Sequence, residues 1–144
     1  MTVRTELVRA PIDTTAILKE LASPGSGAVA MFVGTVRDST GGRGVTGIEY
    51  SAYDAMAERE IIAIVTEAIS AHQSPHIVVE HRLGTLAVGE ASIAIGVAHE
   101  RRAAAIGAMQ YIIEEFKRRV PIWKMEHYED GSRDWVDPTR RSSE

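Results

Sequence analysis

The chain has 144 residues, a length typical of one domain built around one hydrophobic core. Hydrophobic residues make up 44% of it and charged residues 25%, which are ordinary fractions for a globular protein. The net charge of −4 argues against a broad nucleic-acid-binding surface, and no apolar run approaches the roughly 20 residues of a membrane-spanning helix. We therefore expect no nucleic-acid partner and no membrane partner. The first residues lack the layout of a signal peptide, so we expect a cytoplasmic location.

Hydrophobic periodicity predicts seven strands and three helices. The expected strands are 3–10, 28–33, 45–53, 77–83, 91–98, 123–127 and 134–136, and the expected helices follow Asp13, Asp54 and approximately position 100. The run from 28 to 33 is apolar throughout, which indicates a buried strand, and 39–44 is expected to be flexible.

Strands occur in pairs between the expected helices, which is typical of an α+β layer fold. The three helices carry buried stripes, for example Ile61 and Val65 in the second helix and Ile112 and Phe116 in the third. The sequence therefore predicts one α+β domain over residues 1–144, with three main helices and a mixed or antiparallel sheet.

The residue types limit the chemistry. The absence of cysteine excludes disulfides, thiolate metal sites and any mechanism in which this chain carries sulfur on its own thiol. Of the 16 basic residues only Lys19, Lys117 and Lys124 are lysines. A lysine provides a compact amine that a planar guanidinium cannot replace, although drift in genome composition is an equally good explanation for any one of them.

The segment 116–124 combines both candidate lysines. Lys117 lies in the last turn of the third helix, Pro121 turns the chain, and Lys124 follows on the next strand. This order can bring two ammonium groups towards one pocket, where they would attract a carboxylate or phosphate. The alternative is a cationic helix end followed by a solvated strand.

Further basic residues lie where elements begin or end. Arg37 follows a strand and is placed to bind an anion, while the glycine-rich stretch 41–44 resembles a phosphate loop less than a mobile hairpin. His99 precedes a helix, where an anion or a proton transfer is possible and solvated charge is the alternative. His81 and His99 lie on separate strands with no third ligand implied by the spacing, so we predict no metal site.

Four motifs together resemble the large, catalytic subunit of molybdopterin synthase. They are Phe32–Asp38, Tyr50–Ala57, His81–Gly84 and Val120–Glu126, in the order and spacing of that family, and the likeness extends over about residues 3 to 137. The resemblance implies an α/β-hammerhead fold and a homodimer of large subunits. It also implies a partner, a small ubiquitin-like sulfur-carrier subunit whose C-terminal Gly-Gly thiocarboxylate enters a pocket. The implied substrate is cyclic pyranopterin monophosphate, the product is the dithiolene of molybdopterin, and no resident cofactor is expected.

The resemblance also assigns roles to residues. Lys117 and Lys124 match the two active-site lysines; Arg37, His99 and Arg101 are assigned to substrate binding, with part of that pocket supplied by the neighbouring protomer. Arg140, in a tail 138–144 that we expect to be disordered, is a further candidate for the substrate phosphate. Phe32, Met109 and Ile122 are the expected apolar neighbours of the carrier tail.

The chain departs from the family pattern at individual residues. Glu100 follows His99 where the family usually has Arg, so we expect Arg101 to substitute for it, and Ser51 replaces a common Glu. Two other functions stay open at this stage: a non-catalytic dimeric scaffold that binds a ubiquitin-like tail, and a regulatory domain that recognises a phosphorylated ligand.

Overall fold

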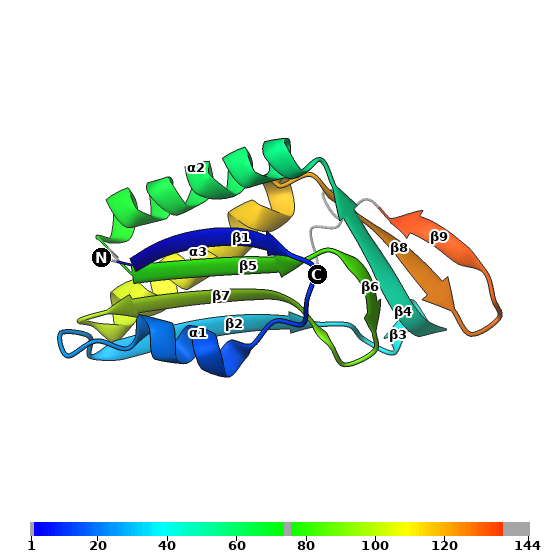
Figure 1. The fold of residues 1–144 in the computed structure, drawn as a ribbon, viewed down its shortest axis with the longest axis horizontal. Helices are drawn as coiled ribbons and strands as arrows, with labels where there is room; N and C mark the ends of the chain where they lie inside the picture. The colour runs from blue at the N-terminus through cyan, green and yellow to red at the C-terminus, as the bar shows by residue number, and fades with distance from the viewer. Residues whose placement is uncertain (1, 74–75, 137–144) are drawn as a thin grey trace.

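The computed structural model describes residues 2–73 and 76–136. Within these residues the chain forms three helices and nine strands in two sheets (Figure 1). In chain order they are β1 (Thr2–Val8), α1 (Thr14–Leu21), β2 (Ala28–Thr35), β3 (Ser39–Thr40), β4 (Arg43–Ala52), α2 (Asp54–His72), β5 (His76–Arg82), β6 (Gly84–Ala87), β7 (Ala91–His99), α3 (Arg102–Arg119), β8 (Ile122–Tyr128) and β9 (Arg133–Val136).

The main sheet has the strand order β1-β5-β7-β2. β1 runs parallel to β5, and the β5–β7 and β7–β2 pairs are antiparallel, so the sheet is mixed. Helices α2 and α3 pack on one face, where Ile77, Val79 and Ile95 join the largest core cluster. Helix α1 packs on the other face, against Val78 and Ala94 (Figure 1). Alternate residues of β5 and β7 are therefore buried on opposite faces of the sheet.

The second sheet lies beyond one end of the main sheet (Figure 1). Its long strand β4 pairs antiparallel with β8 and β6, β8 pairs with β9, and β3 adds a short hairpin to β4. Ile48, Leu86 and Tyr128 contribute to a separate small core. β4 leads directly into α2, and α3 leads directly into β8, so the two long helices connect the sheets.

In helix α1 the local sequence determines both where the helix begins and which of its residues pack on the sheet. The side chain of Asp13 accepts a hydrogen bond from the backbone N–H of Ala16 at 3.0 Å, which caps the helix start. Ile17 and Leu21 are buried against the sheet, whereas the neighbouring Leu18 is 45% exposed. A Cβ atom at Gly96 would overlap the side chain of Leu21, so a glycine in β7 allows the helix to approach this closely.

The α+β class, the three helices and the mixed sheet predicted from the sequence are confirmed. The short strands β3 and β6 were not predicted, because each is too short to show a period.

The prediction that 28–33 is buried was wrong for one face: β2 is an edge strand, and Val29 and Val33 are 40% and 38% exposed. Helix α1 packs on β5 and β7, and although Met31 of β2 packs against the same cluster, Val29 and Val33 on this face stay exposed. Among the described residues, no helix combines the length and apolar character needed to cross a membrane.

Candidate functional site

Two adjoining cavities open where the main sheet meets the second sheet. The narrow cavity has a volume of about 70 Å³ and the wide cavity about 280 Å³. Together we name them the lysine pocket, because the residues that line both are Tyr50, Ser92, Ile93, Lys117 and Lys124. The narrow cavity is closed by His81, Ile113, Phe116, Val120 and Ile122, and the wide one by Phe32, Gly34, Thr35, Arg37, Thr40 and Ile48.

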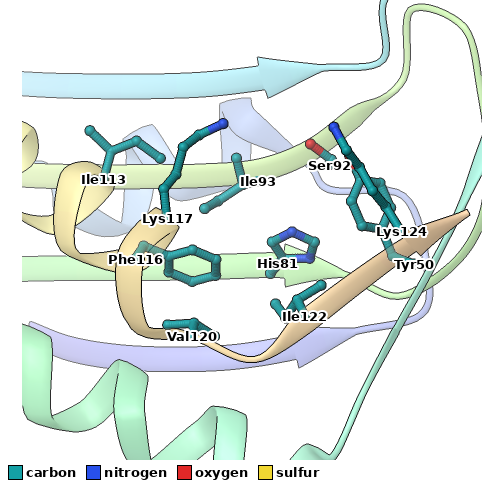
Figure 2. Close-up of a pocket in the computed structure, with 10 residues that line it drawn as sticks. All are labelled: Tyr50, His81, Ser92, Ile93, Ile113, Phe116, Lys117, Val120, Ile122 and Lys124. Atoms are coloured by element: carbon teal, nitrogen blue, oxygen red, sulfur yellow. The ribbon is translucent and has the colours of Figure 1, made fainter. Parts of the chain in front are cut away.

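The two lysines reach this pocket from elements joined by a short turn. The backbone N–H of Val120 donates to the carbonyl oxygen of Phe116 at 3.0 Å, which closes the last turn of α3 just after Lys117. Pro121 cannot continue the helix, and β8 begins at Ile122 with Lys124 two residues further on the same face. Figure 2 shows both amines directed into one space beside Ser92.

A buried histidine forms the floor of the narrow cavity. The ring of His81 stacks on Phe116 with centroids 5.5 Å apart and meets Tyr50 edge-on at 5.1 Å. Burial lowers the pKa of His81 from its ordinary 6.5 to about 4; the positive charge of Lys117 adds to this, and the hydrogen bond with the Arg82 carbonyl opposes it. His81 is therefore neutral at neutral pH.

A network of ion pairs fixes the helix turn that carries Lys117. The guanidinium of Arg119 donates to Glu67 at 2.7 Å and to Glu60 at 3.1 Å, both on α2. The hydroxyl of Tyr111 donates to the same Glu67 at 2.5 Å. The hydrogen bond from Arg119, and then that from Tyr111, lower the pKa of the Glu67 carboxyl. These contacts tie the C-terminal half of α3 to α2 and so hold Lys117 in place.

The structure brings together five of the residues assigned to the site from the sequence. Lys117, Lys124, Arg37, Phe32 and Ile122 all line the lysine pocket. Met109 is partly buried against the main core and lines neither cavity. Arg140 and the rest of the tail 138–144 lie outside the described residues.

His99 and Arg101 lie at the other end of the main sheet. His99 ends β7, seven residues after Ser92, which places it about 24 Å away along the strand. It lines a separate cavity of about 260 Å³ with Ser23, Gly25, Ser26, Gln73, His76 and Glu100. The backbone N–H of Arg101 donates to Nδ1 of His99 at 2.9 Å, and Arg101 itself is the exposed residue before the first turn of α3. Within one chain, these residues do not join the lysines.

The glycine-rich stretch 41–44 forms a turn in the β3–β4 hairpin. Gly41 and Gly42 adopt positive φ angles of 55° and 83°, a backbone conformation that suits glycine. Arg43 donates to Asp134 at 3.2 Å and to Ser132 at 2.8 Å, and its guanidinium lies 3.5 Å from the centre of the Tyr128 ring. Because Arg43 is engaged with the β8–β9 hairpin, the hairpin interpretation is supported over a phosphate loop.

Sequence reasoning did not assign Tyr50, His81, Ser92 or Ile93 to the pocket. The sequence argued against His81 as a metal ligand, and in the structure it lies at the end of the main sheet opposite His99. The signal was present, because His81 and Tyr50 begin two of the motifs that carry the family resemblance. Ser92 and Ile93 carried no such signal, since only the pairing of β7 between β5 and β2 places them beside the lysines.

The model of the MoaE protein family matches residues 7–119. The chain belongs to the MoaE family. A molybdopterin synthase catalytic subunit from Oryza sativa subsp. indica is 46% identical over 119 residues, which are 79% of this chain and 62% of the rice protein. The chain thus spans about three-fifths of the length of this curated MoaE relative.

Solved structures of the MoaE family have the same fold. The molybdopterin synthase structure from Staphylococcus aureus matches with a TM-score of 0.85 at 34% identity, covering 91% of this chain and 95% of that one. A complex of subunits 1 and 2 of molybdopterin-converting factor from Helicobacter pylori matches with a TM-score of 0.77 at 24% identity, covering 92% and 89%. The second likeness supports the fold alone.

Proposed function

We propose that this chain is a molybdopterin synthase catalytic subunit, a sulfurtransferase that converts cyclic pyranopterin monophosphate to the dithiolene of molybdopterin. The observation that carries the proposal is the placement of two lysine amines, Lys117 and Lys124, at the junction of a narrow and a wide cavity. A transfer between two ligands requires that both reach one reactive centre, and this junction provides such a centre. The chain has no cysteine, so the sulfur arrives on a partner.

The two cavities suit two different ligands. The narrow cavity, with a volume of about 70 Å³, is walled by apolar side chains such as Phe116 and Ile122, which fits the slender end of a peptide. It receives the thiocarboxylate end of a small ubiquitin-like carrier. The wide cavity contains Arg37, whose guanidinium can bind a phosphate in a bidentate manner, and it receives the phosphorylated substrate.

The two lysines have different roles towards the two ligands. Lys124 acts in acid–base chemistry or transiently engages the carrier carboxylate, and Lys117 positions the carrier tail or the substrate. Both line both cavities, so either amine can contact the group that is transferred.

The chain acts as a homodimer in which His99 and Arg101 serve the neighbouring lysine pocket. Among the strands that the structure describes, β2 pairs only with β7, and its uncovered face exposes Val29 and Val33. His99 lies beside Ala28 at one end of β2, and Arg37 follows the other end. A two-fold axis near the middle of β2 would bring His99 of one copy towards Arg37 of the other. The chain takes a small-subunit partner in addition; the Helicobacter pylori structure with the same fold is a complex of subunits 1 and 2 of molybdopterin-converting factor.

A reconstitution assay tests the proposed function. The purified chain is mixed with a thiocarboxylated small subunit and cyclic pyranopterin monophosphate, and formation of the dithiolene product is followed. We expect product only when the small subunit carries the thiocarboxylate; the matched control is the same subunit with an ordinary carboxylate. A stable complex without product would instead support a non-catalytic scaffold, and Glu100→Arg would then be the first variant to examine.

A further inference from the structure

The lysine pocket contains a polar group that the proposed chemistry of the two lysines does not use. His81 lies in the narrow cavity with only 5% of its surface exposed, between the rings of Phe116 and Tyr50. Aromatic contacts on a face and an edge fix the plane of the imidazole. A side chain held this firmly is suited to present one atom at one place.

The hydrogen bond to the backbone determines which atom is presented. Nδ1 of His81 lies 2.8 Å from the carbonyl oxygen of Arg82, and a carbonyl oxygen can only accept, so Nδ1 carries the proton. The ring is neutral because burial lowers its pKa to about 4. Nε2 is then a lone-pair acceptor, and Figure 2 shows a ring nitrogen on the side that faces the amines of Lys117 and Lys124.

The pocket therefore offers two opposite kinds of hydrogen-bonding group. Lysine ammonium groups only donate, whereas Nε2 of neutral His81 only accepts. A simple anion can accept hydrogen bonds from the lysines, but it has no hydrogen to donate to Nε2 of His81. The lone pair of Nε2 would then face a negative charge, which is unfavourable. A ligand that carries an N–H a few bonds from its anionic group satisfies both. The last residue of a polypeptide has this arrangement, with an amide N–H on one side of Cα and the terminal acid group on the other.

We propose that His81 is a binding residue of the carrier-tail site, whose Nε2 accepts a hydrogen bond from the amide N–H of the tail's last residue while Lys117 and Lys124 hold its acid group. The inference rests on the proposed function, because it assumes that a carrier tail enters the narrow cavity. It adds a determinant of specificity: the site recognises the final peptide bond in addition to the negative charge. The apolar walls at Phe116 and Ile122 leave the last residue little room for a side chain, which favours glycine.

A change of one ligand atom tests this directly. Two semisynthetic versions of a ubiquitin-like small subunit are made, one ending in Gly-Gly and one in which an ester oxygen replaces the final amide N–H. A third, with the ester one residue earlier, is the matched control for the general effect of an ester. We expect the chain to bind the amide form about three- to tenfold more tightly than the terminal ester, with little discrimination against the control.

Two variants of the histidine sharpen the result. In His81→Gln the side-chain amide reaches the position of Nε2 and can still accept, whereas in His81→Asn it reaches only the position of Nδ1. We expect His81→Gln to keep the preference for the amide and His81→Asn to bind amide and ester equally. Because the measurement is a ratio of two ligands on one protein, a general loss of folded protein does not imitate it.

The outcomes separate this inference from the proposed function. Equal binding of amide and terminal ester by the unmodified chain, with affinity that still falls in Lys117→Ala, would overturn the role of His81 and leave the tail site intact. Binding of the small subunit that is unaffected by Lys117→Ala and Lys124→Ala would instead contradict the proposed tail site itself.

Discussion

The two ends of strand β7 differ in how completely one chain builds them. At the Ser92 end, α3 and β8 close over the sheet, and apolar side chains surround a histidine and two lysine amines. At the His99 end the described residues that line the cavity are polar residues such as Ser26, His76 and Glu100, together with Gly25. Both ends carry a histidine beside a terminus of α3, so residue type alone does not distinguish them.

The difference shows that enclosure, more than the presence of polar groups, prepares a site. His81 is buried, its tautomer is fixed by the Arg82 carbonyl, and its pKa is strongly lowered. His99 is partly exposed, and its Nδ1 accepts the N–H of Arg101 at the start of α3. Under the proposed function, one end of β7 binds and reacts within a chain, and the other is half of a site that needs a second surface.

The largest effect is expected at the enclosed end. Lys124→Ala should lower kcat of the reconstituted enzyme by at least about a hundredfold, because an amine at the reactive centre is lost while the half-buried position on β8 accepts a methyl group. Single-turnover product formation measures it. Lys19→Ala, on α1 and remote from the pocket, is the matched control and should retain full activity. Substantial residual turnover in Lys124→Ala would remove this amine from the mechanism.

Mixed dimers test whether the open end completes a neighbouring site. His99→Ala and Lys124→Ala chains are each expected to be impaired alone. A hybrid dimer contains one doubly altered site and one intact site if His99 acts across the interface. Random mixing in equal amounts should therefore restore about a quarter of full activity, far above the sum of the separate variants. Activity that stays at the average of the two parents would place His99 in the pocket of its own chain or in neither.

The pH dependence of stability should report on the burial of His81. Its folded-state pKa is about 4 against an ordinary 6.5, so between these values the unfolded chain binds a proton that the folded chain does not. Stability contributed in this way is present above pH 6.5 and is lost as the pH falls towards 4. The free energy of unfolding should fall by about 2 kcal/mol more between pH 7.5 and 5 in the parent chain than in His81→Gln. Denaturant titrations at both pH values measure it, and parallel curves would show that His81 is not buried in a neutral form.

The smallest effect is expected at Lys117. Lys117→Ala should raise KM for the small subunit or the substrate by about tenfold with a smaller change in kcat, since one of two donors to the anionic group remains. Steady-state kinetics over both concentrations separate the two parameters. Lys117→Arg is the informative companion, because it keeps the charge and changes the shape. Unchanged kinetics in Lys117→Ala would contradict a role in positioning either ligand.

The fold could be predicted from the sequence largely because its helices and long strands carry clear periods. The stripe through Ile61 and Val65 and the cap at Asp13 each specify an element locally. The edge position of β2 could not be predicted in this way, because an apolar run has the same composition whether one face or both are covered. Covering depends on where α1 packs, which is a tertiary property.

The candidate site was predictable where its residues are close in the chain. Lys117 and Lys124 are separated by one turn at Pro121, so the sequence indicated that they could meet. His81 of β5 joins them because its ring stacks on Phe116 near the end of α3, and His99 is separated from them because it ends β7, seven residues beyond Ser92. Sequence position therefore predicted the pair of amines and not the histidine that lines the same cavity.

The lysine pocket is formed by residues of both the main sheet layer and the second sheet, so its shape depends on how these two parts are oriented. Lys117 and His81 belong to the main sheet and its covering helix, whereas Lys124 and Tyr50 belong to the second sheet. The distance between the two amines therefore depends on the angle at which the two sheets meet. Val120 and Ile122 lie where α3 ends and β8 begins, and their side chains are only 2% and 4% exposed. A change of volume at either one would alter the distance between the two amines as well as the wall of the narrow cavity.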